Sequence, residues 1–257
     1  RDDGKAFGFD IQTLARIKAE YSDRVQFYAQ YYNDPNDPGS ERISREKFQY
    51  YNPRKLKKEG SKWFYNDKKL NVYAAVDFAF SLSKAADFTA IVVIGVDSES
   101  NYYVLDIDRF KTDKTLEYFK HVLALHTKWR FNKLRAEVSV AQKVIVNSIK
   151  EYAKREGLSL SVDEYRPTRS EGSKEERIEA ALGHLYDNLQ VWHLEGGWTS
   201  VLEEELVLAR PSHDDIKDAL ASAVAIAITP ATKHGSGVGD FFTQTQNTHP
   251  RFGGMKF

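Results

Sequence analysis

Three runs of apolar residues in the middle of the chain are typical of buried β-strands. They are NVYAAVDF at residues 71–78, TAIVVIGV at 89–96 and YYVLDIDRF at 102–110, all rich in Val, Ile and Tyr. Only the short segments SLSKAADF and DSESN connect them. Because short connections join antiparallel neighbours, the pattern predicts a meander of three antiparallel strands.

Beyond residue 112, apolar residues recur at helical spacing and alternate with short apolar runs. The helical pattern predicts helices over residues 113–130, 141–157, 173–188 and 213–228. The apolar runs predict strands over residues 133–138, 159–165 and 189–194. Three antiparallel strands followed by alternating helices and strands predict an α/β fold, in which a mixed sheet is covered by helices on both faces.

Three local signals mark helix ends. Gly157 lies where a helix C-cap is expected, because glycine readily adopts the left-handed conformation. Ser173 and Glu176 have the spacing of a capping box. Ser212 and Asp215 have nearly the same spacing, so they could cap the last helix in the same way.

The ends of the chain differ in composition from its middle. Residues 1–69 are expected to form an irregular, partly helical segment, residues 70–229 the folded domain, and residues 230–257, rich in Gly, Thr, Gln and Asn, a flexible tail. Residues 41–69 carry ten Lys or Arg against four acids, a local net charge of +6. This basic segment is either a solvated surface or a surface that contacts phosphates.

Composition limits the nucleic-acid, membrane, disulfide and metal sites that the chain can form. Lys and Arg together number 37, as do Asp and Glu, so a nucleic-acid surface must be a local patch. The absence of cysteine excludes disulfides and Cys-ligated zinc. The apolar run ALASAVAIAI is too short to span a bilayer, so no membrane partner is expected. The chain begins with Arg1 and its only methionine is Met255, which predicts a fragment or a processed product.

Four carboxylates stand on or beside elements whose other residues belong in a core. Asp77 lies near the end of the first strand of the meander, Glu137 lies near the end of the strand at 133–138, and Asp214 and Asp215 open the last helix. Clustered buried carboxylates repel one another, and a divalent cation relieves that repulsion. Carboxylate oxygens suit Mg²⁺ or Mn²⁺, and phosphodiester cleavage is a chemistry that such ions support.

Each acid also has a purely structural interpretation. Asp77 could be a turn residue or an ion-pair partner, and Glu137 could pair with Arg135 or Lys133. The two acids of the last helix could interact favourably with its N-terminal dipole. A single histidine such as His213 is more often a packing residue than a ligand. The functional interpretation therefore depends on the combination of acids and not on any one of them.

The order of these acids resembles the RNase H-like superfamily, and specifically the nuclease domain of the large terminase subunit of tailed bacteriophages. VYAAVDFAFSLSKAADFTAIVVIGVD resembles the first hairpin of that family, RAEV its fourth strand, and HDDIKDALA its HDD-x-x-DALA signature. FYAQYYNDP resembles the segment that follows the ATPase domain in these proteins. The resemblance implies an RNase H-like sheet, in which three antiparallel strands are followed by parallel strands.

The resemblance also implies a site that binds one or two Mg²⁺ or Mn²⁺ ions. Its catalytic metal ligands would be Asp77, Glu137 and Asp215. Asp214 and Asp87, the latter in the ADFTA context, are further candidate ligands. His213 and Asp218 are expected just behind the ligands, where they would orient them; Asp218 shares a helix face with Asp215.

Basic residues near this site are expected to contact DNA. Lys174 and Arg177 resemble a K-x-x-R-I pattern of the family, although they could equally lie on an ordinary exposed helix face. Arg166 and Arg169 lie in the loop YRPTRSEGS, which could contact the DNA. Such contacts go to phosphates, so cleavage should depend little on sequence and strongly on salt.

The function implied is that of an endodeoxyribonuclease that cuts concatemeric double-stranded DNA when viral genome packaging begins and ends. The chain has no G-x-x-x-x-G-K-[ST] loop, so no ATP site is expected in it. The full-length protein would work with the portal and the small terminase subunit in the host cell cytoplasm. Two alternatives stay open: a transposase, integrase or resolvase of the same superfamily, and a docking module that binds the portal or DNA without cutting.

Overall fold

A long central strand, β4 (Lys68–Asp77), organises the fold. The computed structural model describes residues 42–79, 88–139, 142–208 and 211–231, together with positions 13, 14, 16, 17, 30 and 31. Strand β5 (Thr89–Val96) pairs antiparallel with β4, and β6 (Tyr102–Phe110) pairs antiparallel with β5. The predicted meander of three antiparallel strands is confirmed.

Two parallel strands complete the centre of the sheet. Strand β7 (Lys133–Glu137) pairs parallel with β4, and β8 (Val162–Tyr165) pairs parallel with β7. The central order is therefore β6-β5-β4-β7-β8, which is the arrangement expected of an RNase H-like sheet. At the β6 edge, β9 (Val191–His193) and then β1 (Gln49–Tyr50) continue the sheet in parallel.

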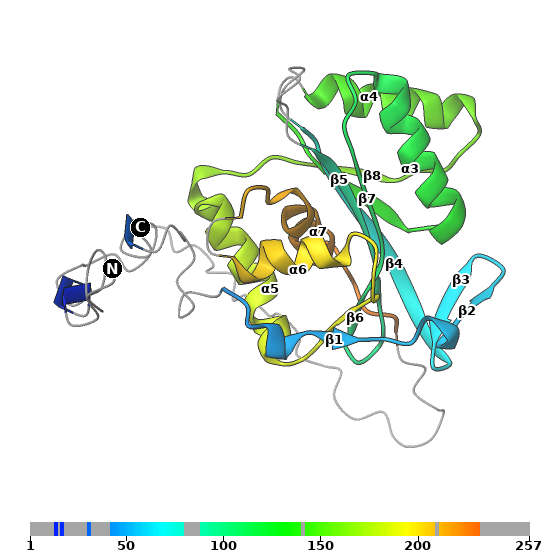
Figure 1. Cartoon of the computed structure of the whole chain (residues 1–257). Coiled ribbons are helices and arrows are strands. Elements are labelled where there is room, and N and C mark those ends of the chain that lie inside the picture. Colours follow the sequence, from blue (N-terminus) through cyan, green and yellow to red (C-terminus); the bar gives the residue numbers. More distant parts are fainter. Residues whose placement is uncertain are drawn as a thin grey trace, which may run out of the picture.

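Helices cover both faces of this sheet, as the alternation of elements predicted. Helices α3 (Thr115–Trp129) and α4 (Gln142–Arg155) cover one face. Helices α5 (Lys174–Asp187), α6 (Thr199–Val207) and α7 (Asp215–Ala225) cover the other. Figure 1 shows the two helical layers on opposite sides of β4 and β5. The predicted α/β fold class is confirmed.

The alternation of side chains along β4 assigns its residues to two separate cores. Val72, Ala74 and Val76 belong to the core beneath α3 and α4, whereas Tyr73 and Ala75 belong to the core beneath α5, α6 and α7. Because successive side chains point to opposite faces of a strand, Asp77 belongs to the same face as Tyr73 and Ala75. The last residue of β4 is thus directed to the α7 side.

The basic segment before β4 forms structure that the pattern did not predict. Strands β2 (Leu56–Glu59) and β3 (Lys62–Tyr65) form an antiparallel hairpin, and β3 pairs antiparallel with the start of β4. Short 3-10 helices lie at Arg45–Lys47, Pro53–Lys55 and Arg169–Glu171. The domain boundaries at residues 69 and 229 stay predictions, although residues on both sides of position 69 belong to one sheet. The tail from residue 232 onward lies outside the described residues.

Two of the three predicted helix-end signals are confirmed. Ser173 and Glu176 form a capping box at the start of α5, and Gly157, with φ of +65°, follows α4 in the left-handed region. The third prediction is wrong, because the N-cap residue of α7 is Asp214 and no side chain of its own segment caps the helix. Within the described residues, no helix is both long and apolar enough to cross a membrane.

Candidate active site

Two neighbouring strands bring the first pair of acids together. In the parallel pairing of β4 and β7, Val76 lies opposite Ala136, and each is followed by one acid, Asp77 and Glu137. Because parallel strands end at the same edge of a sheet, these two carboxylates emerge side by side and on the same face. Both side chains line one pocket with a volume of about 600 Å³.

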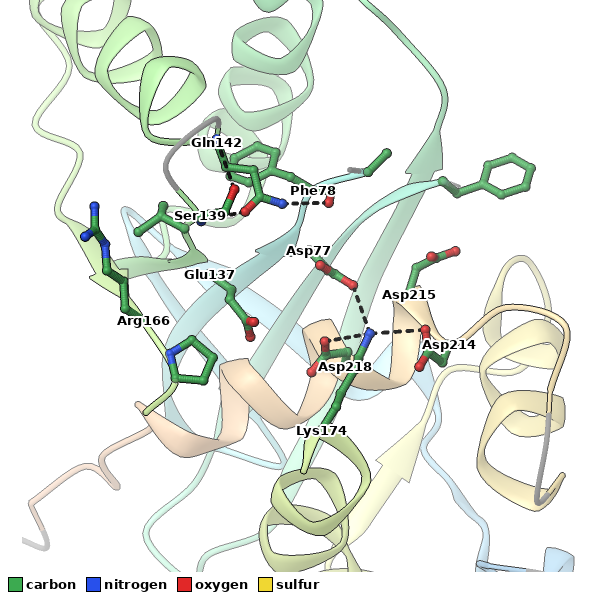
Figure 2. Close-up of a pocket in the computed structure, with 14 residues that line it drawn as sticks. Asp77, Phe78, Glu137, Ser139, Gln142, Arg166, Lys174, Asp214, Asp215 and Asp218 are labelled. Carbon is green, nitrogen blue, oxygen red and sulfur yellow. Dashed lines mark hydrogen bonds and ion pairs between the residues drawn. The ribbon is translucent and has the colours of Figure 1, made fainter. Parts of the chain in front are cut away.

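Helix α7 brings the remaining acids to this pocket. The helix packs on β4 and β5, and its first turn lines the same pocket as the last residue of β4. Asp214 and Asp218 are four residues apart and therefore share a helix face. Asp214, Asp215 and Asp218 all line the pocket that contains Asp77 and Glu137 (Figure 2). Five carboxylates from three elements thus meet at one place.

Polar contacts brace the strand ends that carry the first two acids. The Gln142 side-chain amide donates to the Phe78 carbonyl at 3.1 Å, and its carbonyl accepts from the Ser139 backbone N–H at 2.7 Å. Gln142 therefore ties the exit of β4 to the exit of β7. On the other side of β4, the Thr89 hydroxyl accepts from the Ala79 backbone N–H at 3.0 Å. These contacts hold Asp77 and Glu137 at a defined separation.

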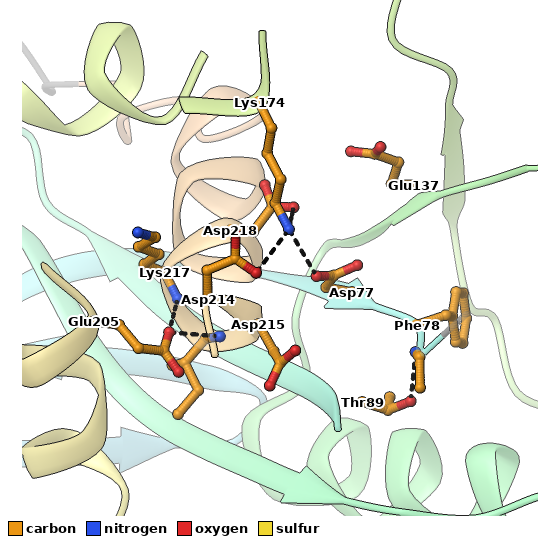
Figure 3. Close-up of polar contacts among 12 residues, drawn as sticks. Asp77, Phe78, Thr89, Glu137, Lys174, Glu205, Asp214, Asp215, Lys217 and Asp218 are labelled. Carbon is orange, nitrogen blue, oxygen red and sulfur yellow. Dashed lines mark hydrogen bonds and ion pairs between the residues drawn. The ribbon is translucent and has the colours of Figure 1, made fainter. Parts of the chain in front are cut away.

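The ammonium group of Lys174 lies among three of the carboxylates. Its Nζ atom is 3.0 Å from Asp218 Oδ2, 3.1 Å from Asp214 Oδ1 and 3.6 Å from Asp77 Oδ2. Figure 2 and Figure 3 show this side chain entering the pocket from the start of α5. Although burial alone would lower the pKa of Lys174, the charges of Asp77, Asp218 and Asp214 raise it well above its ordinary value. Lys174 therefore stays positively charged within the cluster of acids.

The environment of Asp77 and Glu137 disfavours their charged forms and so raises their pKa values. Burial, followed by the negative charge of Asp218, raises the pKa of Asp77 to about 8, although Lys174 opposes the shift. Burial and then Asp218 also raise the pKa of Glu137, against the charge of Arg177. One neighbouring lysine therefore does not balance these acids, and a further cation would stabilise their charged forms.

Asp215 differs from the other acids, because a buried arginine binds it. Arg109 Nη2 on β6 lies 2.9 Å from Asp215 Oδ2, and both side chains are only 7% exposed. The Arg109 guanidinium also lies over the ring of Phe88, 3.9 Å from its centroid. Asp218, in contrast, contacts Lys174 and acts on the pKa values of both Asp77 and Glu137. Of the acids on α7, Asp218 is the one most closely coupled to the strand acids.

A carboxylate from α6 anchors the start of α7. One oxygen of Glu205 accepts the backbone N–H groups of Ile216 at 3.0 Å and Lys217 at 2.9 Å, as Figure 3 shows. Burial raises the pKa of Glu205 to about 7, although the N–H of Lys217 partly opposes the shift. A helix N-terminus leaves such N–H groups without partners inside the helix. Glu205 thus takes the capping role that the sequence pattern assigned to Ser212 and Asp215.

The predicted site residues divide into those the structure brings together and those it does not. Asp77, Glu137, Asp214, Asp215, Asp218, Lys174 and Arg166 all line the pocket. Arg177 lies just beside the pocket, with its Nη2 atom 3.5 Å from Glu137 Oε2. His213 packs edge-on against Phe88 instead of lining the pocket. Asp87 lies outside the described residues, as does the side chain of Arg169.

Sequence reasoning missed several residues that shape this site. Arg109 lies in a predicted strand, but the pattern gives it no role in the site. Glu205 lies in α6, a helix that was not predicted. No sequence signal links either residue to α7, since the contacts span 106 and 11 positions. Gln142, near the start of its predicted helix, also passed unnoticed. Lys174 was expected to contact DNA, and its contacts with three acids were not foreseen.

The donor set suits a hard divalent cation, although the acids do not yet form a complete metal site. Within the described ranges, no three His, Asp or Glu side chains are grouped so that they could hold one ion. Carboxylate oxygens are the ligands that Mg²⁺ and Mn²⁺ prefer, and a lysine ammonium group already occupies a position between three of them. The chemistry therefore fits such an ion, provided that Lys174 moves aside.

No family model matches this chain, and no curated protein matches it. It is similar to the large terminase nuclease from thermophilic phage G20c, at 15% identity over 70% of this chain and 95% of that chain, with a TM-score of 0.45. It is also similar to a T. thermophilus RuvC in complex with a Holliday junction, at 17% identity over 60% and 91%, with a TM-score of 0.37. A Fowlpox virus resolvase in complex with Holliday junction DNA matches at 14% identity over 60% and 95%, with a TM-score of 0.39. The likeness is one of fold, and none of the three descriptions says what this chain binds or cuts.

Proposed function

We propose that the chain is a metal-dependent DNA endonuclease domain. The observation that carries the proposal is the meeting of five carboxylates from β4, β7 and α7 in one open pocket, with the pKa of Asp77 raised to about 8. Perturbed acids of this kind gather at functional sites, because structural roles rarely require so many like charges in contact. Basic side chains at the same pocket suit a substrate with negative charge.

Asp77, Glu137 and Asp218 are the residues best placed to hold Mg²⁺ or Mn²⁺, with Asp214 beside them. When bound, one or two such ions supply an activated water and stabilise the leaving oxygen of a phosphodiester. Asp215, one of the three catalytic ligands that the resemblance implies, is instead paired with Arg109. In this arrangement Asp215 fixes α7 against β6 and helps to keep Asp218 turned toward the strand acids.

In this proposal the basic side chains at the pocket also bind the phosphates of the DNA. Once Lys174 leaves the acids, its ammonium group is free to bind a phosphate of the DNA backbone next to the site. Arg177, beside Glu137, and Arg166, at the rim of the pocket, provide further phosphate contacts. Contacts of this kind position the strand without reading its bases, so we expect cleavage with little sequence specificity.

We further infer that this nuclease serves viral genome packaging. The support is the resemblance of the hairpin around Asp77 and of HDDIKDALA to the large terminase subunit of tailed bacteriophages. The domain would then cut concatemeric DNA at the start and end of packaging. In a full-length protein it would act beside the portal and the small terminase subunit, in the host cell cytoplasm.

Nicking of supercoiled plasmid tests the proposed nuclease directly. The protein is incubated with plasmid in Mn²⁺ or in Mg²⁺, and the nicked and linear products are separated on a gel. We expect cleavage that EDTA abolishes and that Asp77→Asn lowers by at least about 1,000-fold, since it removes a ligand shared with the chemistry. Asp187→Asn is the matched control, because Asp187 is 62% exposed and pairs with Lys47 outside the pocket.

The possible outcomes separate the alternatives. Failure of the wild type to nick in either metal, across a range of salt, would contradict the nuclease and favour a docking module. Joining of pre-cut ends to a second DNA would favour a transposase or integrase. Selective cutting of four-way junctions over linear duplex would favour a resolvase.

A further inference from the structure

A basic surface lies on the β2–β3 hairpin, far from the pocket of acids. We propose that this surface binds the phosphate backbone of double-stranded DNA that extends beyond the cutting site. The inference rests on the proposed nuclease function, and it adds a second DNA contact that the catalytic pocket does not provide. We name this surface the hairpin face and define it by Lys57, Lys62, Phe64 and Lys69.

The charge of the hairpin is strongly one-sided. Between residues 53 and 69, seven side chains are basic and two are acidic. Lys57 pairs with Asp67 and Lys68 pairs with Glu99. The remaining cations in the described part of the chain have no acidic partner within 4.0 Å: Arg54, Lys55, Lys58, Lys62 and Lys69. Uncompensated cations clustered on a protein with no net charge form the local patch that a polyanion requires.

Strand register gathers the hairpin face into a single row. Lys57 lies opposite Phe64 across β2 and β3, and Phe64 lies opposite Lys69 across β3 and β4. Directly opposed side chains share one face of a sheet, so these three lie side by side, with Lys62 two residues along the same strand. All three lysines are exposed, and the Phe64 ring belongs to neither hydrophobic core.

The opposite face of the hairpin holds this row in place. Tyr65 and Leu70 are buried in the core beneath α3, and Trp63 packs against that core. The Trp63 indole N–H donates to the Trp129 carbonyl at 3.0 Å, and Lys58 Nζ donates to the Lys128 carbonyl at 2.9 Å. The cations of the hairpin face are therefore carried by an anchored strand pair, and little conformational entropy is lost when they meet a ligand.

The hairpin face lies at a fixed distance from the site. Lys69 and Asp77 are both on β4, on the same face, and eight residues apart. At about 3.3 Å per residue this separates them by about 26 Å, the length of about 8 base pairs of B-form DNA. Figure 1 shows the hairpin at the far end of β4, away from α5, α6 and α7. A short duplex at the pocket would leave the hairpin face free, whereas a longer duplex could reach it.

Charge favours DNA over other partners for this surface. The pocket presents five carboxylates against Lys174, Arg177 and Arg166, so its own surroundings attract a polyanion only weakly. Binding energy for DNA must then come from cations elsewhere, because phosphate neutralisation dominates the affinity for duplex. Exposed lysines beside one ring, of which Lys62 and Lys69 have no acidic partner within 4.0 Å among the described residues, suit phosphates better than an apolar protein surface.

Fluorescence anisotropy in metal-free buffer tests the inference, since it needs no cleavage. Binding of a duplex of about 30 base pairs, which is longer than the separation between Lys69 and Asp77, is compared with binding of a duplex of about 8 base pairs. The test variant is Lys62→Gln/Lys69→Gln. The control variant is Lys120→Gln/Lys154→Gln, which removes two exposed lysines from α3 and α4.

We expect the test variant to bind the longer duplex about tenfold more weakly and to lower the slope of log affinity against log salt by about 2. The test variant should also bind the short duplex more weakly, because the metal-free pocket attracts DNA only weakly. Both affinities of the control variant should be unchanged. Equal loss in both double variants, or no loss in the test variant, would overturn the inference. So would equal competition by a poly-glutamate peptide, which would assign the hairpin face to an acidic protein.

The two proposals fail in different ways. If the wild type cuts plasmid while the test variant binds the long duplex normally, the hairpin face has no role and the nuclease stands. If the wild type binds the long duplex through the hairpin face and does not cut, the nuclease proposal falls and the surface remains a DNA-binding site.

Discussion

At the scale of single residues, Lys174 has the most unusual environment in the site. Its ammonium group contacts Asp77, Asp214 and Asp218, so it partly neutralises acids that would otherwise repel one another. A divalent cation at the proposed site would compete with Lys174 for the same oxygens. The lysine would therefore stabilise the metal-free protein and oppose metal binding at the same time.

Replacing Lys174 should separate these two effects. We expect Lys174→Met to lower the melting temperature of the metal-free protein, because three carboxylates lose their nearest cation. The same variant should bind Mn²⁺ about tenfold more tightly, which corresponds to about 1.4 kcal/mol. Isothermal titration calorimetry with Mn²⁺ measures the affinity, with Lys154→Met as the exposed control. Weaker Mn²⁺ binding in Lys174→Met would show that the lysine supports the metal instead of competing with it.

The raised pKa of Asp77 predicts how stability depends on pH. The folded carboxyl has a pKa of about 8, compared with about 4 when unfolded, so the folded state binds a proton more tightly. Its contribution to stability is complete below about pH 4 and is lost as the pH rises toward 8. We expect the unfolding free energy in EDTA to fall over this interval, and to fall less in Asp77→Asn by up to about 1.4 kcal/mol per pH unit. Urea unfolding at pH 5, 6 and 7 measures both proteins, and parallel curves would contradict the shift.

At the scale of elements, the hydrophobic pattern was sufficient where burial is regular. Strands β4, β5 and β6 and helices α3, α4, α5 and α7 lie close to their predicted ranges, because each has the period of its element. The pattern failed for β2 and β3, whose many lysines hide the alternation that buries Tyr65. It also failed for α6, a helix of only nine residues.

The acids of the site could be predicted where they interrupt an apolar pattern, but their tertiary partners could not. Asp77 and Glu137 stood out because each is a charged residue at the end of an apolar strand, and the structure brings them together. The partners of α7 could not be read from the sequence, since Arg109 and Glu205 reach it only through tertiary contacts. Whether Asp215 or Asp218 faces the strands depends on the rotation of α7, which those contacts fix.

Glu205 provides a test of this rotation. Glu205→Ala leaves the buried N–H of Ile216 and the half-buried N–H of Lys217 without their acceptor, which should cost about 1–3 kcal/mol of unfolding free energy and weaken Mn²⁺ binding by about tenfold. Glu205→Gln keeps a carbonyl acceptor and removes a charge near Asp215, so both quantities should stay close to those of the wild type. Urea unfolding and calorimetry measure the two effects, with exposed Glu204→Ala as the control. Equal damage from Glu205→Gln would assign the effect to charge and not to capping.

At the scale of the whole molecule, the sheet separates two hydrophobic cores with different relations to the site. The core beneath α5, α6 and α7 contains the helix that carries Asp214, Asp215 and Asp218. The core beneath α3 and α4 supports the sheet from the other face. Damage to the first core should therefore move the three acids of α7, whereas equal damage to the second core, away from Gln142, should leave these three acids in place.

Two matched substitutions distinguish the cores. Leu220 on α7 and Ile149 on α4 are each at most 1% exposed, and replacing either with alanine should cost about 2–5 kcal/mol of unfolding free energy. Leu220 lies two residues beyond Asp218, so Leu220→Ala should also weaken Mn²⁺ binding by about tenfold as α7 shifts. Ile149→Ala should leave Mn²⁺ affinity within twofold of the wild type, because α4 contributes no acid to the pocket. If both variants lost metal affinity in proportion to stability, the site would depend on the fold as a whole, and the separate role of α7 would be wrong.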